Sequence, residues 1–234
     1  MRRGDFTWPK VPITLTSEEE AAREAFMMAW HEELPTRYAF VERFNHGCLS
    51  HLTVPANART LEIGAGIGGH LPFEDLGVQE YHVLESRAEF CVRLAEQIPA
   101  ERVHEASIEE RQAFPDGFFD RVIAVHVLEH LRNLPAAVEE ISRLLRPGGV
   151  FDVVLPTEGS LAYSVARKIS AERMFKKRFG LDYGPIIRNE HVNTYAEVDS
   201  QLRRYFVDDT TRFFPLPLPV AEFNLVVGRR MLRV

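Results

Sequence analysis

The stretch LEIGAGIGGH, residues 61–70, decides the fold class, because a short apolar run leads directly into a turn rich in glycine. Glycine lets a strand turn sharply into a helix and lets a ligand approach the backbone closely. Gly64, Gly66 and Gly69 have the G-x-G-x-x-G spacing of a dinucleotide-binding loop. The same stretch also places Glu62 two residues before the first glycine. The two patterns favour different ligands, and the charge of Glu62 distinguishes them.

A carboxylate at position 62 suits a cationic ligand better than a diphosphate. The pyrophosphate of a dinucleotide would bind the amides of such a turn, but Glu62 would repel it by about 1 kcal/mol or more at close range and moderate dielectric. S-adenosylmethionine has an ammonium and a sulfonium and no phosphate, so the acid favours this cofactor. Glu85 lies about 20 residues after Gly64, where an acid can accept both ribose hydroxyls of either cofactor.

The segment around this loop alternates short apolar runs with helical patterns. Such alternation predicts βαβ units and a parallel sheet with right-handed crossovers. The expected strands are residues 59–63, 81–84, 102–103, 121–125 and 150–155, and the expected helices between them include 86–98 and 134–146.

The two ends of the chain have other patterns. Ser17 with Glu20 fits a capping box, and we expect a helix from there to about Leu34, ended by Pro35, and a second one over 36–51. The C-terminal part contains a basic amphipathic segment at 160–180, an expected helix at 195–205, and two closing strands at 206–214 and 222–230.

Composition excludes several classes of protein. The formal net charge of −6 argues against general nucleic-acid binding, which needs a basic surface. No apolar run approaches the roughly 20 residues that cross a bilayer. The first residues lack the apolar segment of a secretory signal, so we expect a cytoplasmic protein. Cys48 and Cys91 have no metal-type spacing, and we assign no metal ligand.

Residues 61–155 resemble a class I S-adenosylmethionine-dependent methyltransferase. The resemblance lies in LEIGAGIGG, YHVLE, PDGFFDRVIAVHVLEHL, LLRPGG and VFDVVLP, which follow one another in the order and spacing of that family. It implies an α/β fold with a Rossmann-like, doubly wound, mostly parallel seven-stranded sheet with one antiparallel strand. We therefore expect an N-terminal helical extension or lid at 1–55 and the methyltransferase domain at 56–234, with an acceptor-region insertion at about 160–200.

The resemblance also implies a set of residues around S-adenosylmethionine. In place of the aspartate that many family members have after the third strand, this chain has the sequence EASIE at 105–109. Among the N-terminal residues, Tyr38 is our candidate for a contact from the lid. The implied cofactor residues are Glu62, Gly64, Ala65, Gly66 and Gly68 for the methionine part, Glu85 for the ribose, Ser86, Ser107 and Ile108 for the adenine, and His126, facing the cofactor from the end of the fourth strand.

Methyl transfer itself needs little chemistry from the protein, because the sulfonium is already a strong electrophile. A hydroxyl acceptor must also lose its proton, and histidine suits that role. His130, expected to open the helix after the fourth strand, and His191, in RNEHVNTY, are the catalytic candidates, and each could instead be structural. The basic residues at 167–178 could recognise an acidic acceptor or form a solvated face.

These observations favour transfer of a methyl group to a small-molecule or glycan/lipid-precursor acceptor, at oxygen in preference to nitrogen or carbon. Two alternatives stay open: an NAD-dependent oxidoreductase, and a module that binds S-adenosylmethionine without catalysis. The sequence names neither the acceptor nor the oligomeric state.

Overall fold

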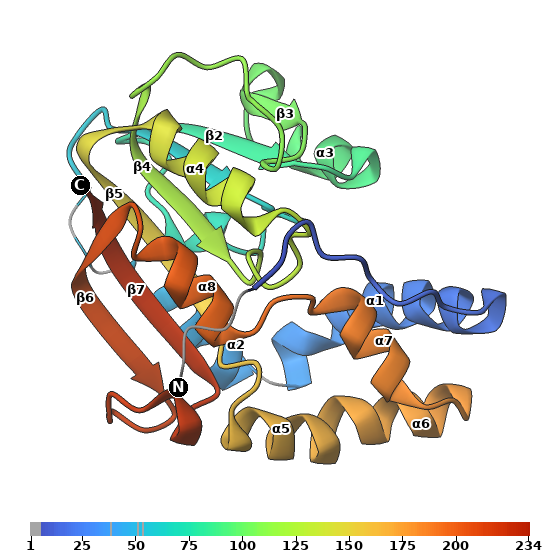
Figure 1. Ribbon diagram of the computed structural model, residues 1–234. Helices are drawn as coiled ribbons and strands as arrows, with labels where there is room; N and C mark the ends of the chain where they lie inside the picture. The colour runs from blue at the N-terminus through green and yellow to red at the C-terminus, as the bar shows by residue number, and fades with distance from the viewer. Residues whose placement is uncertain (1–5, 38, 51, 53) are drawn as a thin grey trace.

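A mixed seven-stranded sheet forms the centre of the molecule (Figure 1). The computed structural model describes residues 6–37, 39–50, 52 and 54–234. The side chains of residues 28–38 are not among the parts that it describes. The strand order is β3-β2-β1-β4-β5-β7-β6, with β7 antiparallel to both of its neighbours, which confirms the expected fold class. The strands are β1 Arg59–Ile63, β2 Glu80–Glu85, β3 Val103–Glu105, β4 Phe119–Val125, β5 Leu145–Pro156, β6 Phe206–Phe214 and β7 Val226–Arg233.

Apolar clusters cover both faces of the sheet. Neighbouring side chains in a strand point to opposite faces. In β4, Val122 and Ala124 pack in the cluster that includes Ile141 of α4 (Leu134–Leu144). Ile123, on the other face, packs with Leu94 of α3 (Ala88–Leu94). Helices on both faces are what a doubly wound sheet requires.

The N-terminal helices differ in detail from the expected ones. Helix α1 spans Ser17–Arg37 and is followed by α2 (Ala39–Gly47), so α1 does not end before Pro35. Proline lacks the backbone N–H donor of one helical hydrogen bond. Because Pro35 lies near the end of α1, few further hydrogen bonds of the helix follow it. The cap is one residue earlier than expected: Glu19 N donates to Thr16 Oγ1 at 3.2 Å, and Thr16 N donates to the Glu19 carboxylate at 2.8 Å.

The segment after β5 forms a group of helices that packs against α1 (Figure 1). Phe26 of α1 lies 5.2 Å from Phe175 and 5.6 Å from Tyr183 between ring centroids. These contacts join the two ends of the chain in a small core of their own. The helices of this segment are α5 Leu161–Arg167, the π-helix η3 Lys168–Glu172, α6 Arg173–Phe179 and α7 Tyr183–Glu190, and the last three contribute to the small core. Helix α8 Tyr195–Leu202 packs in the main core. The short 3₁₀ turns are η1 Leu71–Phe73, η2 Ala100–Arg102 and η4 Ala221–Phe223.

Whether the N-terminal helices act as a lid stays a prediction, as do the boundaries of the two expected units. Among the described residues, no helix combines the length and the apolar character needed to pass through a membrane.

Candidate functional site

The backbone conformation of the glycine loop after β1 is one that residues with a side chain rarely adopt. Gly64, Gly66 and Gly68 all have positive φ, at 63°, 57° and 87°. A Cβ atom on Gly64 would also lie 2.7 Å from Cγ2 of Val127. The loop after β4 therefore packs directly against the turn that the sequence assigns to the cofactor, with Ala65 buried between these glycines.

Glu62 is buried in the middle of the sheet, 3% exposed. The hydroxyl of Tyr81 donates to Glu62 Oε2 at 2.8 Å. Burial raises the pKa of Glu62, although His70, the Tyr81 hydrogen bond and Arg121 act against it. A cationic group bound at the loop would stabilise the ionised carboxylate. Its role toward the cofactor stays a prediction.

The end of β2 reaches the same loop through Glu85. Its carboxylate accepts hydrogen bonds from Gly66 N at 2.9 Å and from Arg87 N at 3.0 Å, and Ser86 Oγ lies 3.4 Å from it. Ala106 N donates to the carbonyl of Glu85 at 3.1 Å, so the segment after β3 lies beside β2. The loop and both strand ends thus meet at one edge of the sheet, as in other doubly wound folds.

The two residues expected near the adenine differ in their surroundings. Ile108 is 2% exposed and packs in the main core, so it offers no free apolar surface here. Ser107 is half-buried, and its hydroxyl accepts a hydrogen bond from Glu109 N at 3.3 Å. The adenine contacts stay predictions.

His126, directly after β4, has a φ of 54°, which is rare for a residue with a side chain. Its amide donates to the carbonyl of Val154 at 3.0 Å. Nδ1 lies 3.2 Å from Glu129 Oε1, and Nε2 is buried with no hydrogen-bond partner in the part of the chain that the structure describes. Strained backbone of this kind gathers at functional sites. The expected contact of His126 with the cofactor stays a prediction.

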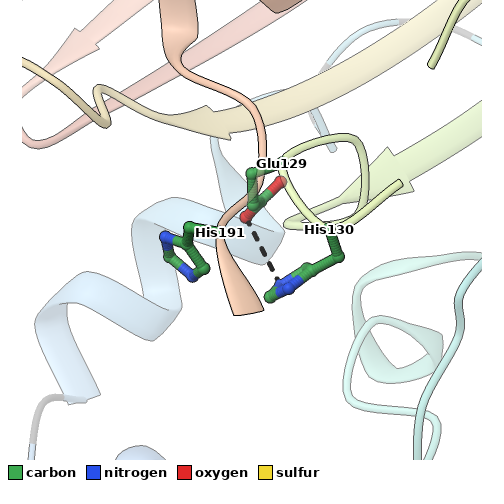
Figure 2. A group of neighbouring side chains, drawn as sticks. All are labelled: Glu129, His130 and His191. Atoms are coloured by element: carbon green, nitrogen blue, oxygen red, sulfur yellow. Dashed lines mark ion pairs between the residues drawn. The ribbon is translucent and has the colours of Figure 1, made fainter. Parts of the chain in front are cut away.

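Two catalytic candidates lie side by side. The rings of His130 and His191 are 4.9 Å apart between centroids, and both lie next to Glu129 (Figure 2). One potential ligand atom from each of the three residues falls within 4.8 Å of the others. His130 does not open a helix as expected, because it occupies the turn before α4, which begins at Leu134. We call these three residues the Glu129 cluster.

Asn193 holds the two segments of the cluster together. Its Nδ2 donates to the carbonyls of Leu128 at 3.0 Å and Leu131 at 2.6 Å, and its amide donates to the carbonyl of Glu129 at 3.0 Å. Trp8 Nε1 donates to its side-chain oxygen at 3.0 Å. A side chain that is fully buried and fully hydrogen-bonded fixes the position of both loops.

Hydrogen bonds also determine which ring nitrogens carry a lone pair. His130 Nδ1 donates to the carbonyl of Glu190 at 2.9 Å, because a carbonyl can only accept. His191 Nδ1 donates to the carboxylate of Glu158 at 2.9 Å. In the neutral rings, both lone pairs are therefore at Nε2.

Within the cluster, the histidines stabilise the charge of Glu129, whereas His191 opposes a charge on His130. Burial would raise the pKa of Glu129, but the His126 hydrogen bond and the nearby histidines outweigh it and lower the pKa to about 2. Burial lowers the pKa of His130, and the nearby His191 adds to this effect, against the attraction of Glu129. Glu129 is therefore an anion at neutral pH.

Sequence reasoning did not single out Glu129 or Glu158. Both follow the carboxyl ends of strands, β4 and β5, where polar residues gather in open α/β sheets. Glu129 also adjoins a histidine that had been singled out. These two signals could have found both carboxylates.

Tyr38 lies outside the described residues. Another residue of the N-terminal segment does reach the glycine loop: a Cβ atom on Gly69 would lie 3.5 Å from Nε2 of His46 in α2. His46 in turn is 3.4 Å from Glu42. The extension thus contacts the loop from a residue that the sequence analysis did not select.

Comparisons with known proteins agree with this architecture. Residues 61–153 match the family model described as a methyltransferase domain. A sterol 24-C-methyltransferase of Aspergillus fumigatus is 29% identical over 124 residues, which are 50% of this chain and 32% of that protein. A sterol 4-C-methyltransferase of Caenorhabditis elegans is 31% identical over 107 residues, 44% of this chain and 32% of that protein. The chain thus spans about a third of the length of these curated relatives.

A solved structure shows the same fold over nearly the whole chain. An S-adenosylmethionine-dependent methyltransferase from Thermotoga maritima superposes with a TM-score of 0.59 at 17% identity, covering 92% of this chain and 99% of that one. The strand order, the glycine loop and the matched family model point the same way. Residues 61–153 therefore match a methyltransferase domain, and the chain has the fold of the class I S-adenosylmethionine-dependent methyltransferases.

Proposed function

We propose that this protein transfers a methyl group from S-adenosylmethionine to a hydroxyl oxygen of an apolar small molecule that binds at the Glu129 cluster. The observation that carries the proposal is the position of the cluster. The Nε2 lone pair of His130 lies in the loop after β4, and that of His191 lies beside this loop. Val127 of the same loop packs against the glycine turn at Gly64. A hydroxyl placed there would be close to both a proton acceptor and the methyl donor.

The chemistry requires one substitution at carbon. A lone pair of the acceptor oxygen forms a bond to the methyl carbon, and the carbon–sulfur bond breaks with its electrons going to sulfur. The products are the methyl ether and S-adenosylhomocysteine. The hydroxyl proton goes to Nε2 of His130 or His191. Alignment of the oxygen with the methyl group and exclusion of water supply the rest of the acceleration.

The apolar character of the acceptor is supported by the helix that follows β5. Tyr163 and Arg167 of α5 face His191 and Glu158: the Tyr163 and His191 ring centroids are 6.3 Å apart, and Arg167 Nη1 lies 2.7 Å from Glu158 Oε1. The other side of α5 and η3 exposes apolar side chains one turn apart, namely Leu161, Val165 and Ile169. An exposed apolar stripe beside a site is typical of proteins that meet lipid-like molecules.

The relatives support the same class of acceptor but a different atom. Both sterol methyltransferases are named for transfer to carbon, so a carbon acceptor is the second candidate. A carbon acceptor such as an alkene would also lose a proton after methyl transfer, and the same histidines could accept it.

The experiment is a methyl-transfer assay with isotope-labelled S-adenosylmethionine and a panel of acceptors. The panel contains sterols, phenols, long-chain alcohols and sugar nucleotides, and NMR of each product identifies the methylated atom. A labelled methyl ether of an apolar alcohol or phenol supports the proposal. A methyl group on carbon establishes the second candidate, and a methylated sugar nucleotide replaces the apolar acceptor by a glycan precursor. Cofactor binding without transfer to any member favours the non-catalytic module.

A further inference from the structure

The Glu129 cluster has the composition of a metal site. One carboxylate and two imidazoles come together from segments about 60 residues apart, with their candidate ligand atoms within 4.8 Å of one another (Figure 2). Two histidines and one carboxylate on one side of an ion form a common site for divalent transition metals, which leaves other positions open. Bond lengths of about 2.1 Å place ligand atoms roughly 3–4 Å apart, so a small closing movement is sufficient.

Each histidine is already oriented as a ligand. His130 donates its Nδ1 proton to the carbonyl of Glu190, and His191 donates its Nδ1 proton to the carboxylate of Glu158. A backbone carbonyl or a carboxylate behind the ring is the usual partner of a metal-binding histidine, because it fixes the tautomer and makes the other nitrogen a better donor.

A second, independent observation points to a ligand. Glu129 is 2% exposed, and its Oε2 is buried without a hydrogen-bond partner among the described residues. A buried carboxylate oxygen without a partner costs about 1–3 kcal/mol or more. Oε1 is already in contact with His126 Nδ1 at 3.2 Å and faces His130 Nε2 at 3.9 Å. A cation bound by this carboxylate would compensate its buried negative charge.

We propose that Glu129, His130 and His191 bind one divalent transition-metal ion of the imidazole-preferring kind, with Zn²⁺ as the reference ion. The identity of the ligands favours such an ion over Mg²⁺, which prefers oxygen donors. Metal binding does not depend on the proposed function. The role of the ion in catalysis does depend on the proposed function. A hydroxyl of the acceptor that binds the ion at an open position has a lowered pKa, releases its proton to water and reacts as the bound alkoxide. The histidine lone pairs then serve as ligands instead of proton acceptors.

Binding is tested on the untagged full-length chain, stripped with a chelator and titrated with Zn²⁺ by calorimetry. We expect one ion per chain and a raised melting temperature at saturation. Glu129→Gln and His191→Ala should bind Zn²⁺ at least about 100-fold more weakly, and Glu158→Gln, which only orients His191, about 10- to 100-fold more weakly. The matched control is His104→Gln, a half-buried histidine remote from the cluster in the sequence, beside His82.

A second measurement replaces Zn²⁺ by Co²⁺, whose visible absorption reports nitrogen ligation without any activity assay. The His104→Gln protein should give the wild-type spectrum, and His191→Ala should lose it. No ion bound to the stripped wild type, or equal binding by wild type and both cluster variants while circular dichroism shows them folded, overturns the proposal.

The activity arm separates this inference from the proposed function. Chelation should abolish methyl transfer while S-adenosylmethionine still binds, and Zn²⁺ or Mn²⁺ should restore it. If the chelated enzyme still transfers methyl groups fully to a hydroxyl, the proposed metal dependence is wrong and the proposed function stands. If Zn²⁺ binds stoichiometrically at the cluster but no hydroxyl is methylated, the metal site stands and the proposed function is wrong.

Discussion

The Glu62 carboxylate is held between neighbouring strands with Tyr81 as its hydrogen-bond donor. If it pairs with the cofactor's ammonium, Glu62→Gln should weaken S-adenosylmethionine binding by about 1–3 kcal/mol, because a charge-assisted contact becomes a neutral one. Calorimetry measures the change. Tyr81→Phe is the control, since it keeps the carboxylate and should lose less affinity. An unchanged affinity in Glu62→Gln rejects the predicted role.

Two glycines of the loop after β1 offer a matched pair of substitutions. Gly66→Ala meets only the cost of positive φ, because no atom of the described residues lies within 4 Å of the added Cβ. Gly64→Ala adds a clash with Val127. We expect losses of about 1–2 kcal/mol for the first and about 2–5 kcal/mol for the second, measured by urea unfolding. Equal losses would mean that the loop after β4 does not press on the turn.

At the level of elements, buried ion pairs join β4, β5 and β7 to the turn before β2. Asp152 of β5 pairs with Arg121 of β4 at 2.7 Å and with Arg230 of β7 at 2.7 Å. Arg121 also pairs with Glu74 at 2.7 Å. Buried pairs of this kind fix register across strands, and removal of one partner leaves a buried charge.

Glu74 makes this network sensitive to acid. Burial would raise its pKa, but hydrogen bonds from His70 and Arg121 and the charge of Arg121 lower it to about 2. A folded-state pKa below the unfolded value gives stability that is present above about pH 4.5 and lost as the pH falls toward 2. The contribution is about 2–3 kcal/mol at neutral pH.

The test compares wild type with Glu74→Gln by urea unfolding at several pH values. The wild type should be more stable at pH 7, and the difference should shrink steadily between pH 5 and the acid limit. A difference that stays constant over this range would show that ionisation of Glu74 does not support the fold.

On the scale of the whole molecule, the helices α1, α6 and α7 share a core that is separate from the main core of the sheet. Phe26 is 3% exposed in this small core. Phe26→Ala should cost about 3–5 kcal/mol locally. Because this core is separate from that of the sheet, we expect faster amide exchange in α6 and α7 and little change in β1 and β4.

Hydrogen–deuterium exchange with mass spectrometry checks this, and Val138→Ala in α4, within the main core, is the control. That variant should raise exchange in the sheet. An equal increase across the whole chain in Phe26→Ala would show that the molecule unfolds as one unit.

The sequence by itself determined the strands, the glycine turn and the cofactor class. Periodicity, turn residues and the acid before the loop are properties of consecutive residues, so they can be recognised without the fold. Local signals were imprecise at boundaries: the capping box lies at Thr16 and Glu19, and α1 continues past Pro35. Both errors are small shifts, because neighbouring residues compete for the same cap and one proline removes only one donor.

Only the tertiary structure decided which polar residues meet. His130 and His191 were both selected from the sequence, yet nothing in it placed them 4.9 Å apart or put Glu129 between them. Their contact depends on Asn193, which ties the end of α7 to the loop after β4, and on Glu158 behind His191. Such proximity arises from packing over long separations in the chain. Local sequence patterns carry no information about it.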